Sequence, residues 1–573
     1  MDNKDIVKKL RAVANLMELH DENAFKVRSY TNAIYNIERI NRTLKDLSLN
    51  ELEKIQGIGK SIAAKVHELI ETGSMKVLDE YLAITPEGIL EMLRIKGLGT
   101  KKIKTLWQEL GITSIAELRK AIAQNQLLSL KGFGAKMQNK INDTIDYYLR
   151  NISKLRYADA EIIARTLLDA IGESGKGINA GFTGQLRRKL NTIDTISLMA
   201  GTTRSGLLLP PLEKTGLMTI DSKKSSPFLI RGTLTDKGTP VCIYLCKPER
   251  YQSRLMLTTG SARHLEYHID DKPNLWSIAN GTNLKNEEEA YSQLNLPYIA
   301  PELREHFIEF ELASKNRMPR LLVTDDLKGI IHNHTTYSDG KHSLTEMAEY
   351  CQTLGYEYLG ISDHSKATAF YANGLNEDRV KQQQDEIDKL NEILTPFRIF
   401  KGIEADILPD GNIDYEPDTL TTFDFVVASV HSVLNMDVVR ATDRVIKAVN
   451  NPYTTILGHM TGRLLLIREG YPLDHKAVID ACADNGVIIE VNAHPQRLDI
   501  DWRWVPYALE KGVLLSINPD AHEKSGYHDM YYGVCAARKG GLTKEMTFNA
   551  FTVETVSEHF RKRKERALTK ITV

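Results

Sequence analysis

Seven short apolar runs in the C-terminal half of the chain each lead into a histidine or a carboxylate, and this pattern constrains the fold most strongly. The runs lie at 329–331, 358–361, 398–400, 425–428, 455–457, 487–491 and 513–517. Runs of this length, bounded by Gly, Pro and Asn, predict buried strands. The segments between them, such as 344–354, 377–394 and 477–485, have helical length and spacing. Seven strand–helix units predict a parallel barrel, whose chemistry lies at the carboxyl ends of the strands.

Metal-binding residue types gather at these strand ends. Ten of the sixteen histidines fall between His332 and His528. Imidazole nitrogen and carboxylate oxygen, without cysteine thiolate, suit zinc, manganese or iron. A carboxylate among several imidazoles can bridge two metals about 3.5–4 Å apart, which clamp the attacking and leaving oxygens of a phosphoryl displacement. The residues alone therefore predict phosphoester hydrolysis.

The same segment, roughly residues 328–573, resembles the PHP (polymerase and histidinol phosphatase) domain. The matching text is HNHTTYSDG at 332–340, SDHS at 362–365, GIEADIL at 402–408, SVHS at 429–432, GHMTGRLL at 458–465 and NPDAH at 518–522. The resemblance implies a distorted (β/α)7 barrel with two or three divalent metals, Zn, Mn or Fe. It implies nine metal ligands: His332, His334, Asp339, His364, Glu404, His431, His459, Asp520 and His522.

The resemblance also implies how these ligands are shared. The first metal would be held by His332, His334, Glu404 and Asp520, the second by Glu404, His431 and His459, and the third by Asp339, His364 and His522. The residues expected to be catalytic are Glu404, His431, Asp339 and Asp520. Arg463 and Arg497 are either phosphate contacts or partners in surface salt bridges.

One short pattern occurs three times in the first 150 residues, as IQGIG at 55–59, IKGLG at 95–99 and LKGFG at 130–134. Two glycines around an apolar residue make a tight turn, and the next helix begins with free backbone N–H groups that can bind a phosphate. This is the helix-hairpin-helix element, which grips nucleic acid without reading its sequence. The expected DNA contacts are Gly57, Gly59, Lys60, Gly97, Gly99, Gly132 and Gly134. Residues 86–150 are also basic, with eleven Lys and Arg against six Asp and Glu.

Residues 1–80 resemble the small lyase domain of family X DNA polymerases. The text AFKVRSY at 24–30 matches that family's 5′-phosphate pocket, which implies Lys26, Arg28 and Tyr30 as contacts. Lys65 falls where relatives that remove a 5′-deoxyribose phosphate keep a Schiff-base lysine. Two readings of Lys65 stay open: a nucleophile, which needs a depressed pKa, or a solvated helix lysine.

Residues 155–315 continue the family X resemblance. GQLRR at 184–188, TGS at 259–261 and LPYIAPELR at 296–304 match elements of the nucleotidyltransferase palm and the thumb. In active members three aspartates hold two magnesium ions and activate the primer hydroxyl.

The three aspartate positions of that palm read Thr195, Ser197 and Cys242 in this chain. Asp194 is the nearest acid but is one residue out of register, and such a shift along a strand points a side chain to the opposite face. A serine, a threonine and a thiol do not make a magnesium site for phosphates. We therefore predict that nucleotide addition is lost.

The 573 residues are expected to form a multidomain α/β protein. The expected parts are a helical lyase-like DNA-binding domain (1–85), a helix-hairpin-helix fingers-like domain (86–152), an α+β nucleotidyltransferase-like palm (153–235), a thumb-like domain (236–315), a linker (316–327) and the PHP barrel (328–573). Five unpaired cysteines and the lack of a long apolar stretch predict a cytoplasmic protein without a membrane segment. We expect a monomer, although the sequence leaves the oligomeric state open.

These features predict a DNA-repair phosphoesterase, a 3′–5′ exonuclease or 3′-end-processing enzyme, acting on gapped or 3′-ended DNA. Three alternatives stay open. One is a non-catalytic scaffold that binds DNA ends, and another is a still-active gap-filling polymerase. The last is a small-molecule phosphatase, which leaves the helix-hairpin-helix repeats unexplained.

Overall fold

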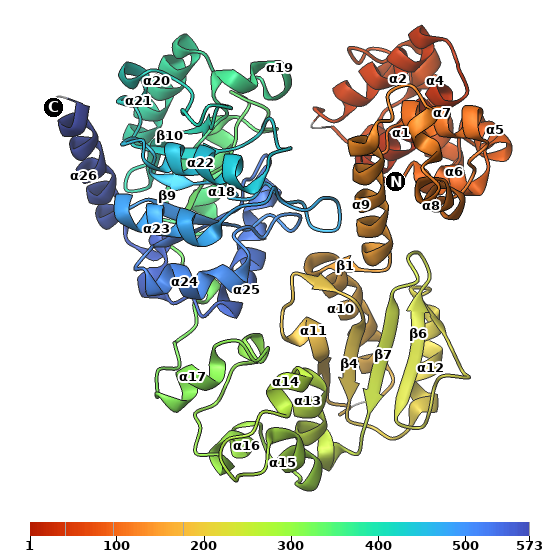
Figure 1. Cartoon of the computed structure of the whole chain (residues 1–573), viewed down its shortest axis with the longest axis vertical. Coiled ribbons are helices and arrows are strands. Elements are labelled where there is room, and N and C mark those ends of the chain that lie inside the picture. Colours follow the sequence, from red (N-terminus) through yellow and green to blue (C-terminus); the bar gives the residue numbers. More distant parts are fainter. Residues whose placement is uncertain (41, 96, 176, 572–573) are drawn as a thin grey trace. The chain divides into compact units, whose positions relative to one another are not determined.

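The computed structural model describes residues 1–40, 42–95, 97–175 and 177–571, so the last two residues of the expected barrel segment lie outside the described residues. The chain folds as two units, Met1–Ile152 and Ser153–Val573 (Figure 1). Within the described ranges, no helix has both the length and the apolar character that a membrane crossing requires.

The first unit is helical throughout its described residues. Its α-helices are α1 (Asn3–Leu19), α2 (Ala24–Ile37), α3 (Leu49–Leu52), α4 (Lys60–Thr72), α5 (Lys76–Ile84), α6 (Glu87–Met92), α7 (Thr100–Leu110), α8 (Ile115–Ala123) and α9 (Ala135–Asn151). One apolar core extends from Ile6 to Ile145. The expected domains 1–85 and 86–152 therefore share a single core.

The three glycine turns have the geometry that the repeats predict. Gly57, Gly97 and Gly132 lie in the left-handed region, with φ of +80°, +97° and +88°. Glycine is required there because it adopts this conformation without a steric penalty. Helices α4, α7 and α9 each begin directly after the second glycine of a turn, and no described side chain caps them. Their first backbone N–H groups therefore have no intrahelical partner.

The second unit begins with a mixed five-stranded sheet. Its strands are β2 (Ala180–Phe182), β4 (Ile196–Ala200), β7 (Pro240–Leu245), β6 (Leu229–Leu234) and β5 (Met218–Ile220), in that spatial order. Helices α10 (Tyr157–Glu173) and α12 (Ser205–Lys214) pack with it around one core. The expected boundary at 235 is wrong, because β7 pairs with both β4 and β6 inside this sheet.

A small helical region follows the sheet and leads into the barrel. Its helices are α13 (Tyr251–Thr259), α14 (Ala262–Leu265), α15 (Leu275–Gly281), α16 (Glu288–Gln293) and α17 (Glu309–Ser314). The segment 316–327, expected as a linker, packs against the barrel: Leu322 and Leu327 join the barrel core, and the Leu322 N–H donates to the Leu542 carbonyl at 2.9 Å.

The C-terminal barrel has seven parallel strands in sequential order, which confirms the predicted architecture. They are β8 (Gly329–Ile331), β9 (Tyr358–Ile361), β10 (Arg398–Asp406), β11 (Phe425–Ser429), β12 (Ile456–Leu457), β13 (Ile488–Asn492) and β14 (Leu515–Asn518). The longer surrounding helices are α18 (Leu344–Thr353), α20 (Glu377–Ile393), α22 (Val438–Val449), α23 (His475–Asn485) and α25 (Met530–Lys539). Helix α26 (Val553–Ile571) packs Val556 and Phe560 into a cluster with strand residues such as Phe425.

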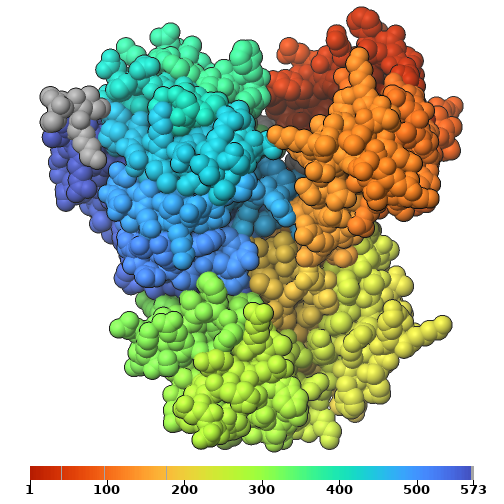
Figure 2. All heavy atoms as spheres, in the orientation of Figure 1, coloured from red at the N-terminus to blue at the C-terminus, as the bar shows by residue number. Residues whose placement is uncertain are grey.

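Helix α25 joins the barrel to the palm sheet region. Lys539 is almost fully buried, and its ammonium group donates to the carbonyls of Arg188 and Glu302 at 2.8 and 3.1 Å and to the Glu305 carboxylate at 2.9 Å. One turn earlier, Cys535 lies in the palm core, with its sulfur 3.0 Å from the Lys189 Nζ. The palm, the helical region and the barrel present a continuous surface in Figure 2.

Asn549 closes the seam between the first and last barrel strands. Among the described residues, no ladder pairs β8 with β14. The buried Asn549 amide spans them instead: Nδ2 donates to the carbonyls of Gly329 and Ile517 at 3.1 and 2.6 Å, and Oδ1 accepts from the Ile517 N–H at 3.0 Å. The Asn549 side chain thus joins the two strands along their length, and beyond their carboxyl ends a backbone bridge between Asn333 and Ala521 continues the closure.

We expect Asn549→Ala to lower the free energy of unfolding of the second unit by about 2–5 kcal/mol, because each buried group left unsatisfied costs about 1–3 kcal/mol. Urea denaturation followed by tryptophan fluorescence measures this. The exposed Asn412, changed to Ala, is the matched control. Equal midpoints for the two variants would contradict the seam-closing role.

Candidate metal centre

The nine predicted ligands converge on the carboxyl-terminal edge of the barrel strands. Six are buried and three, Asp339, His431 and His522, are partly exposed. Their ligand atoms form four overlapping groups, in each of which all atoms lie within 4.8 Å of one another. The groups are His334 with Asp339, His364 and His522; His332 with His334 and Glu404; His332 with His459 and Asp520; and His364 with Glu404 and His431.

Glu404 lies at the centre of these groups. Its Oε1 is 3.3 Å from His332 Nε2, 3.2 Å from His431 Nε2 and 3.0 Å from His459 Nε2. Its Oε2 is 2.9 Å from His364 Nδ1 and 3.7 Å from His334 Nε2. Glu404 is part of β10 itself. The sequence predicted a strand at 398–400, and the observed strand continues beyond it to Asp406.

Seven buried atoms of the predicted ligands have no hydrogen-bond partner among the described residues, and this observation tests whether metals fit the site. The orphaned atoms are His332 Nε2, His334 Nδ1, His364 Nδ1, both ring nitrogens of His459 and both carboxylate oxygens of Glu404. Buried polar atoms without partners cost free energy, so such a concentration needs a compensating ligand. Imidazole and carboxylate donors are the set that divalent zinc, manganese or iron accepts. The residues present therefore fit the metals.

Charge in the pocket also favours cations. Burial alone would raise the pKa of Glu404, but the imidazoles of His431, His332 and His364 outweigh it and hold that pKa well below its ordinary value. Burial opposes charge on His431 too, yet the carboxylates of Glu404 and Asp406 raise its pKa to about 10. The carboxylates thus remain ionised and attract positive charge to the pocket.

Two carboxylates that the sequence analysis did not single out orient the ligands. Glu490, fully buried in β13, contacts His332 Nδ1 at 2.5 Å with Oε1 and accepts the His459 backbone N–H at 2.6 Å with Oε2. Asp406 contacts His431 Nδ1 at 2.9 Å. Such contacts fix the imidazole orientation and leave Nε2 facing the pocket. The signal was present in the sequence, since an acid within the apolar run 487–491 needs a buried partner.

A third carboxylate shapes the loop that carries Asp339. Asp363 is buried and accepts hydrogen bonds from the backbone N–H groups of Thr335 and Ser338 at 2.8 and 3.1 Å. The Gln383 amide on α20 donates to the same carboxylate at 2.6 Å. These bonds hold the turn immediately before Asp339 against β9.

The two arginines proposed from the sequence have different surroundings. The Arg463 guanidinium donates to the Arg497 and Leu498 carbonyls and to Asp501, so the protein itself occupies its donors. Arg497 Nε lies 3.3 Å from Asp520 Oδ2, beside the ligand cluster. Arg497 is therefore the better placed of the two to meet a phosphate.

The three positions at which the family X resemblance places aspartates lie close together in the palm sheet. Ser197 on β4 and Cys242 on β7 are direct partners in a parallel pair, and Thr195 immediately precedes β4. Asp194 is held at the surface, where Gln185 Nε2 donates to it at 2.9 Å and Lys154 Nζ lies 3.3 Å away. In the described parts of the palm, no three potential ligands come together as they do in the barrel.

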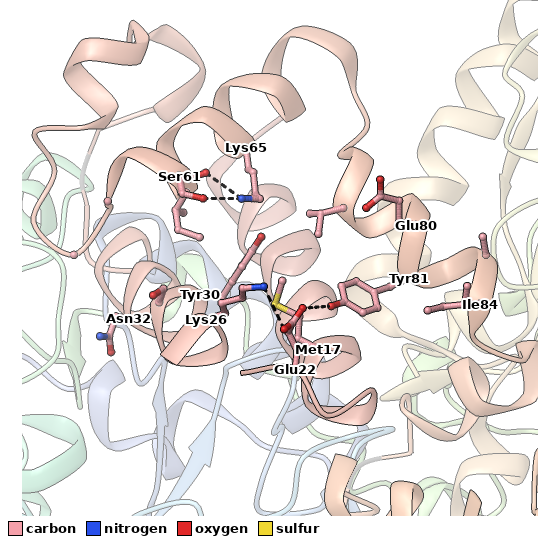
Figure 3. A pocket seen from close by; sticks show the side chains of 16 residues that line it. Met17, Glu22, Lys26, Tyr30, Asn32, Ser61, Lys65, Glu80, Tyr81 and Ile84 are labelled. Atoms are coloured by element: carbon pink, nitrogen blue, oxygen red, sulfur yellow. Dashed lines mark hydrogen bonds and ion pairs between the residues drawn. The ribbon is translucent and has the colours of Figure 1, made fainter. Parts of the chain in front are cut away.

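The first unit contains a hollow of about 1000 Å³ (Figure 3). Lys26, Tyr30 and Lys65 line it, and Lys65 Nζ donates to Ser61 Oγ at 2.8 Å. Burial raises the pKa of Tyr30 to about 12, and its hydroxyl has no hydrogen-bond partner within the described part of the chain. Arg28 lines a separate hollow, because it lies two residues from both Lys26 and Tyr30 on α2 and faces another side.

Family comparisons agree with this architecture. The model of a helix-hairpin-helix domain matches residues 1–75, that of a SAM-like helix-hairpin-helix tandem matches 89–141, and that of the PHP domain matches 331–494. Probable phosphatases from Thermoanaerobacter sp. (strain X514) and Acetivibrio thermocellus are 25% and 29% identical over 246 and 248 residues, which are 41% of this chain and 95% of each relative. The fold and the site define a multidomain protein with a C-terminal PHP domain.

A full-length relative gives the family. The DNA polymerase/3′-5′ exonuclease PolX of Bacillus subtilis (strain 168) is 34% identical over 587 aligned residues, covering 99% of this chain and 100% of the relative. The chain belongs to the PolX family of family X DNA polymerases with a PHP domain. The resemblance drawn from the sequence is thereby confirmed.

We expect Glu490→Gln to lower the metal affinity of the barrel about 10- to 100-fold, because ligand-orienting carboxylates have effects of this size. Elemental analysis after dialysis against graded chelator measures it. Glu416→Gln, at an exposed position of the same barrel, is the control. Retention of metal equal to that of the control would show that Glu490 does not orient the ligands.

Proposed function

We propose that the barrel hydrolyses phosphodiesters at DNA 3′ ends, as a 3′–5′ exonuclease or 3′-end-processing enzyme in DNA repair. The observation that carries the proposal is the convergence of nine candidate metal-ligating side chains, Glu404 among them, in four overlapping groups. The PHP match and the name of the Bacillus subtilis relative, which includes 3′-5′ exonuclease, support the reaction class.

Two or three divalent metals, zinc, manganese or iron, held by the nine ligands would supply the Lewis acidity that polarises a phosphodiester and stabilises its leaving oxygen. The chain's own residues do the positioning. Glu404 presents its two oxygens to opposite halves of the cluster, while Glu490 and Asp406 hold His332 and His431 in fixed orientations. Arg497, beside Asp520, offers a guanidinium to a phosphate oxygen.

We propose that the first unit binds gapped or 3′-ended DNA without reading its sequence. The uncapped helix starts behind Gly59, Gly99 and Gly134 support this, because they offer backbone N–H groups to phosphates. We further propose that Lys26, Tyr30 and their hollow receive a 5′ phosphate. Borohydride trapping on a gap bearing a 5′-deoxyribose phosphate distinguishes the two roles open to Lys65. We also propose that the protein acts as a monomer in the cytoplasm, and the five free thiols support the cytoplasmic location.

We expect Glu404→Gln to reduce digestion of a labelled 3′ end at least about a hundredfold. Metals in such sites supply several kcal/mol to the transition state, and each 1.36 kcal/mol is a factor of ten. The variant keeps the side-chain volume and should bind gapped DNA as the unchanged protein does, since the first unit is untouched. Undiminished digestion would remove the barrel from the reaction and indicate another active site.

We also propose that nucleotide addition is absent. The support is the chemistry of the palm, where Thr195, Ser197 and Cys242 offer two hydroxyls and a thiol instead of three carboxylates. Burial raises the pKa of the Cys242 thiol, so it stays protonated and is a poor ligand for magnesium. Asp194 is occupied by Gln185 and Lys154.

In primer extension on gapped DNA, with magnesium or manganese, we expect no product above background. The assay should use Glu404→Gln protein, so that digestion by the barrel does not mask synthesis. Templated extension by this variant would overturn the proposal and establish an active gap-filling polymerase.

A further inference from the structure

A short helix beside the metal centre, α19 (Ala369–Ala372), carries two exposed aromatic side chains. Phe370 is fully exposed at 103%, and Tyr371 is 57% exposed. Among the described residues, no other large apolar side chain reaches the exposure of Phe370. An aromatic ring that is left fully exposed forgoes about 1.5–3 kcal/mol of transfer free energy, which a partner that covers the ring would regain.

Hydrogen bonds tie both ends of this segment to metal-ligand positions. The Leu375 N–H donates to the His364 carbonyl at 2.9 Å, and Thr368 Oγ1 donates to the carbonyl of Ser365 at 2.8 Å. On the other side, Asn373 Nδ2 donates to the carbonyl of Ser338 at 3.1 Å. Because His364 and Asp339 adjoin these anchors, α19 is placed at the mouth of the cluster.

The segment is held rigidly as well as closely. Asn373 ends α19 in the left-handed conformation, with φ of +54°, and its carbonyl accepts a hydrogen bond from Arg379 at 2.9 Å. At Gly374 a Cβ would collide with the carbonyl oxygen of Ser365, so the return of the chain allows only glycine. The Ala367 N–H donates to Asp414 at 2.7 Å. Phe370 is therefore exposed on a fixed support.

The neighbouring Tyr371 shows that α19 lies near the carboxylates of the ligand cluster. Burial first, and then the negative charges of Asp406, Glu404 and Asp339, raise the pKa of Tyr371 to about 12. The hydroxyl of Tyr371 thus senses the carboxylates of the metal centre, while the adjacent ring of Phe370 faces solvent. Phe370 is thus the direct neighbour, on the same short helix, of a side chain that lies within electrostatic range of the ligand cluster.

We propose that Phe370 stacks on the nucleobase of the 3′-terminal nucleotide while its phosphodiester enters the metal centre. Aromatic stacking tolerates every base, because each base has a π-face, and this suits a chain that grips DNA through its backbone. The ring fixes the unpaired end and leaves the scissile phosphodiester to the ligand cluster. The inference rests on the proposed function, since it assigns the substrate contact of that same site.

The test compares Phe370→Ala with the unchanged protein on two DNA substrates that differ only in the terminal nucleotide, one carrying its base and one abasic. Stacking contributes about 1–3 kcal/mol per base. At 1.4 kcal/mol per factor of ten, we expect KM for the base-bearing end to rise about tenfold in the variant, with kcat little changed. For the abasic end, the variant and the unchanged protein should agree within about twofold.

Two further variants separate stacking from a general loss. Phe370→Trp keeps an aromatic face and should keep the preference for the base-bearing end. Ile393→Ala is the control, because it removes another exposed apolar side chain, at 74% exposure. Ile393 lies at the end of α20, next to the amino end of β10, and the variant should behave as the unchanged protein.

A Phe370→Ala protein that still prefers the base-bearing end to the original extent would overturn the inference. So would an equal loss on both substrates, which would assign Phe370 a structural role. Either result leaves the barrel nuclease in place, whereas failure of the proposed function appears separately, as digestion that survives Glu404→Gln.

Discussion

Five imidazole rings approach one fully buried carboxylate, that of Glu404, and the arrangement of the barrel depends on this convergence. The rings come from the segments that follow β8, β9, β11 and β12, while Glu404 projects from β10 between them. The imidazole rings would not stay clustered without an anion between them. The Glu404 carboxylate, in turn, would not be buried without these rings to offset its charge. Five of the seven strands therefore contribute to this point, four through an imidazole that follows them and β10 through Glu404 itself.

A second layer of charge surrounds that cluster and has a different task. Glu490, Asp406 and Asp363 do not meet at the centre, but hold His332, His431 and the turn before Asp339 from behind. The free energy that a metal would gain depends on these contacts, because a ligand that must first be ordered loses part of its binding energy. The site thus has an inner set of ligands that face the pocket and an outer set of carboxylates that hold those ligands in place.

Much of the barrel could be predicted from the sequence, because each of its strands is a short apolar run that ends in a polar ligand. What periodicity cannot show is a partner far away in the chain. Nothing local marks Asn549 as the residue that closes the β8–β14 seam. The expected boundary at 235 was wrong for a related reason. Strand β7 belongs to the palm sheet although it follows 235, because it forms a hairpin with β6. On α2, adjacent letters in AFKVRSY looked like one pocket, yet helical geometry turns Arg28 away from Lys26 and Tyr30.

The packing of α25 against the palm sheet region has a consequence for that region. Lys539 is buried, and the carbonyls of Arg188 and Glu302 accept hydrogen bonds from its ammonium group. Burial lowers the pKa of this lysine to about 8. A barrel separated from the palm would leave this ammonium group, Cys535 and Tyr531 facing water without the surface that matches them. The palm sheet region therefore has a structural task, the burial of α25, which does not depend on the side chains at positions 195, 197 and 242.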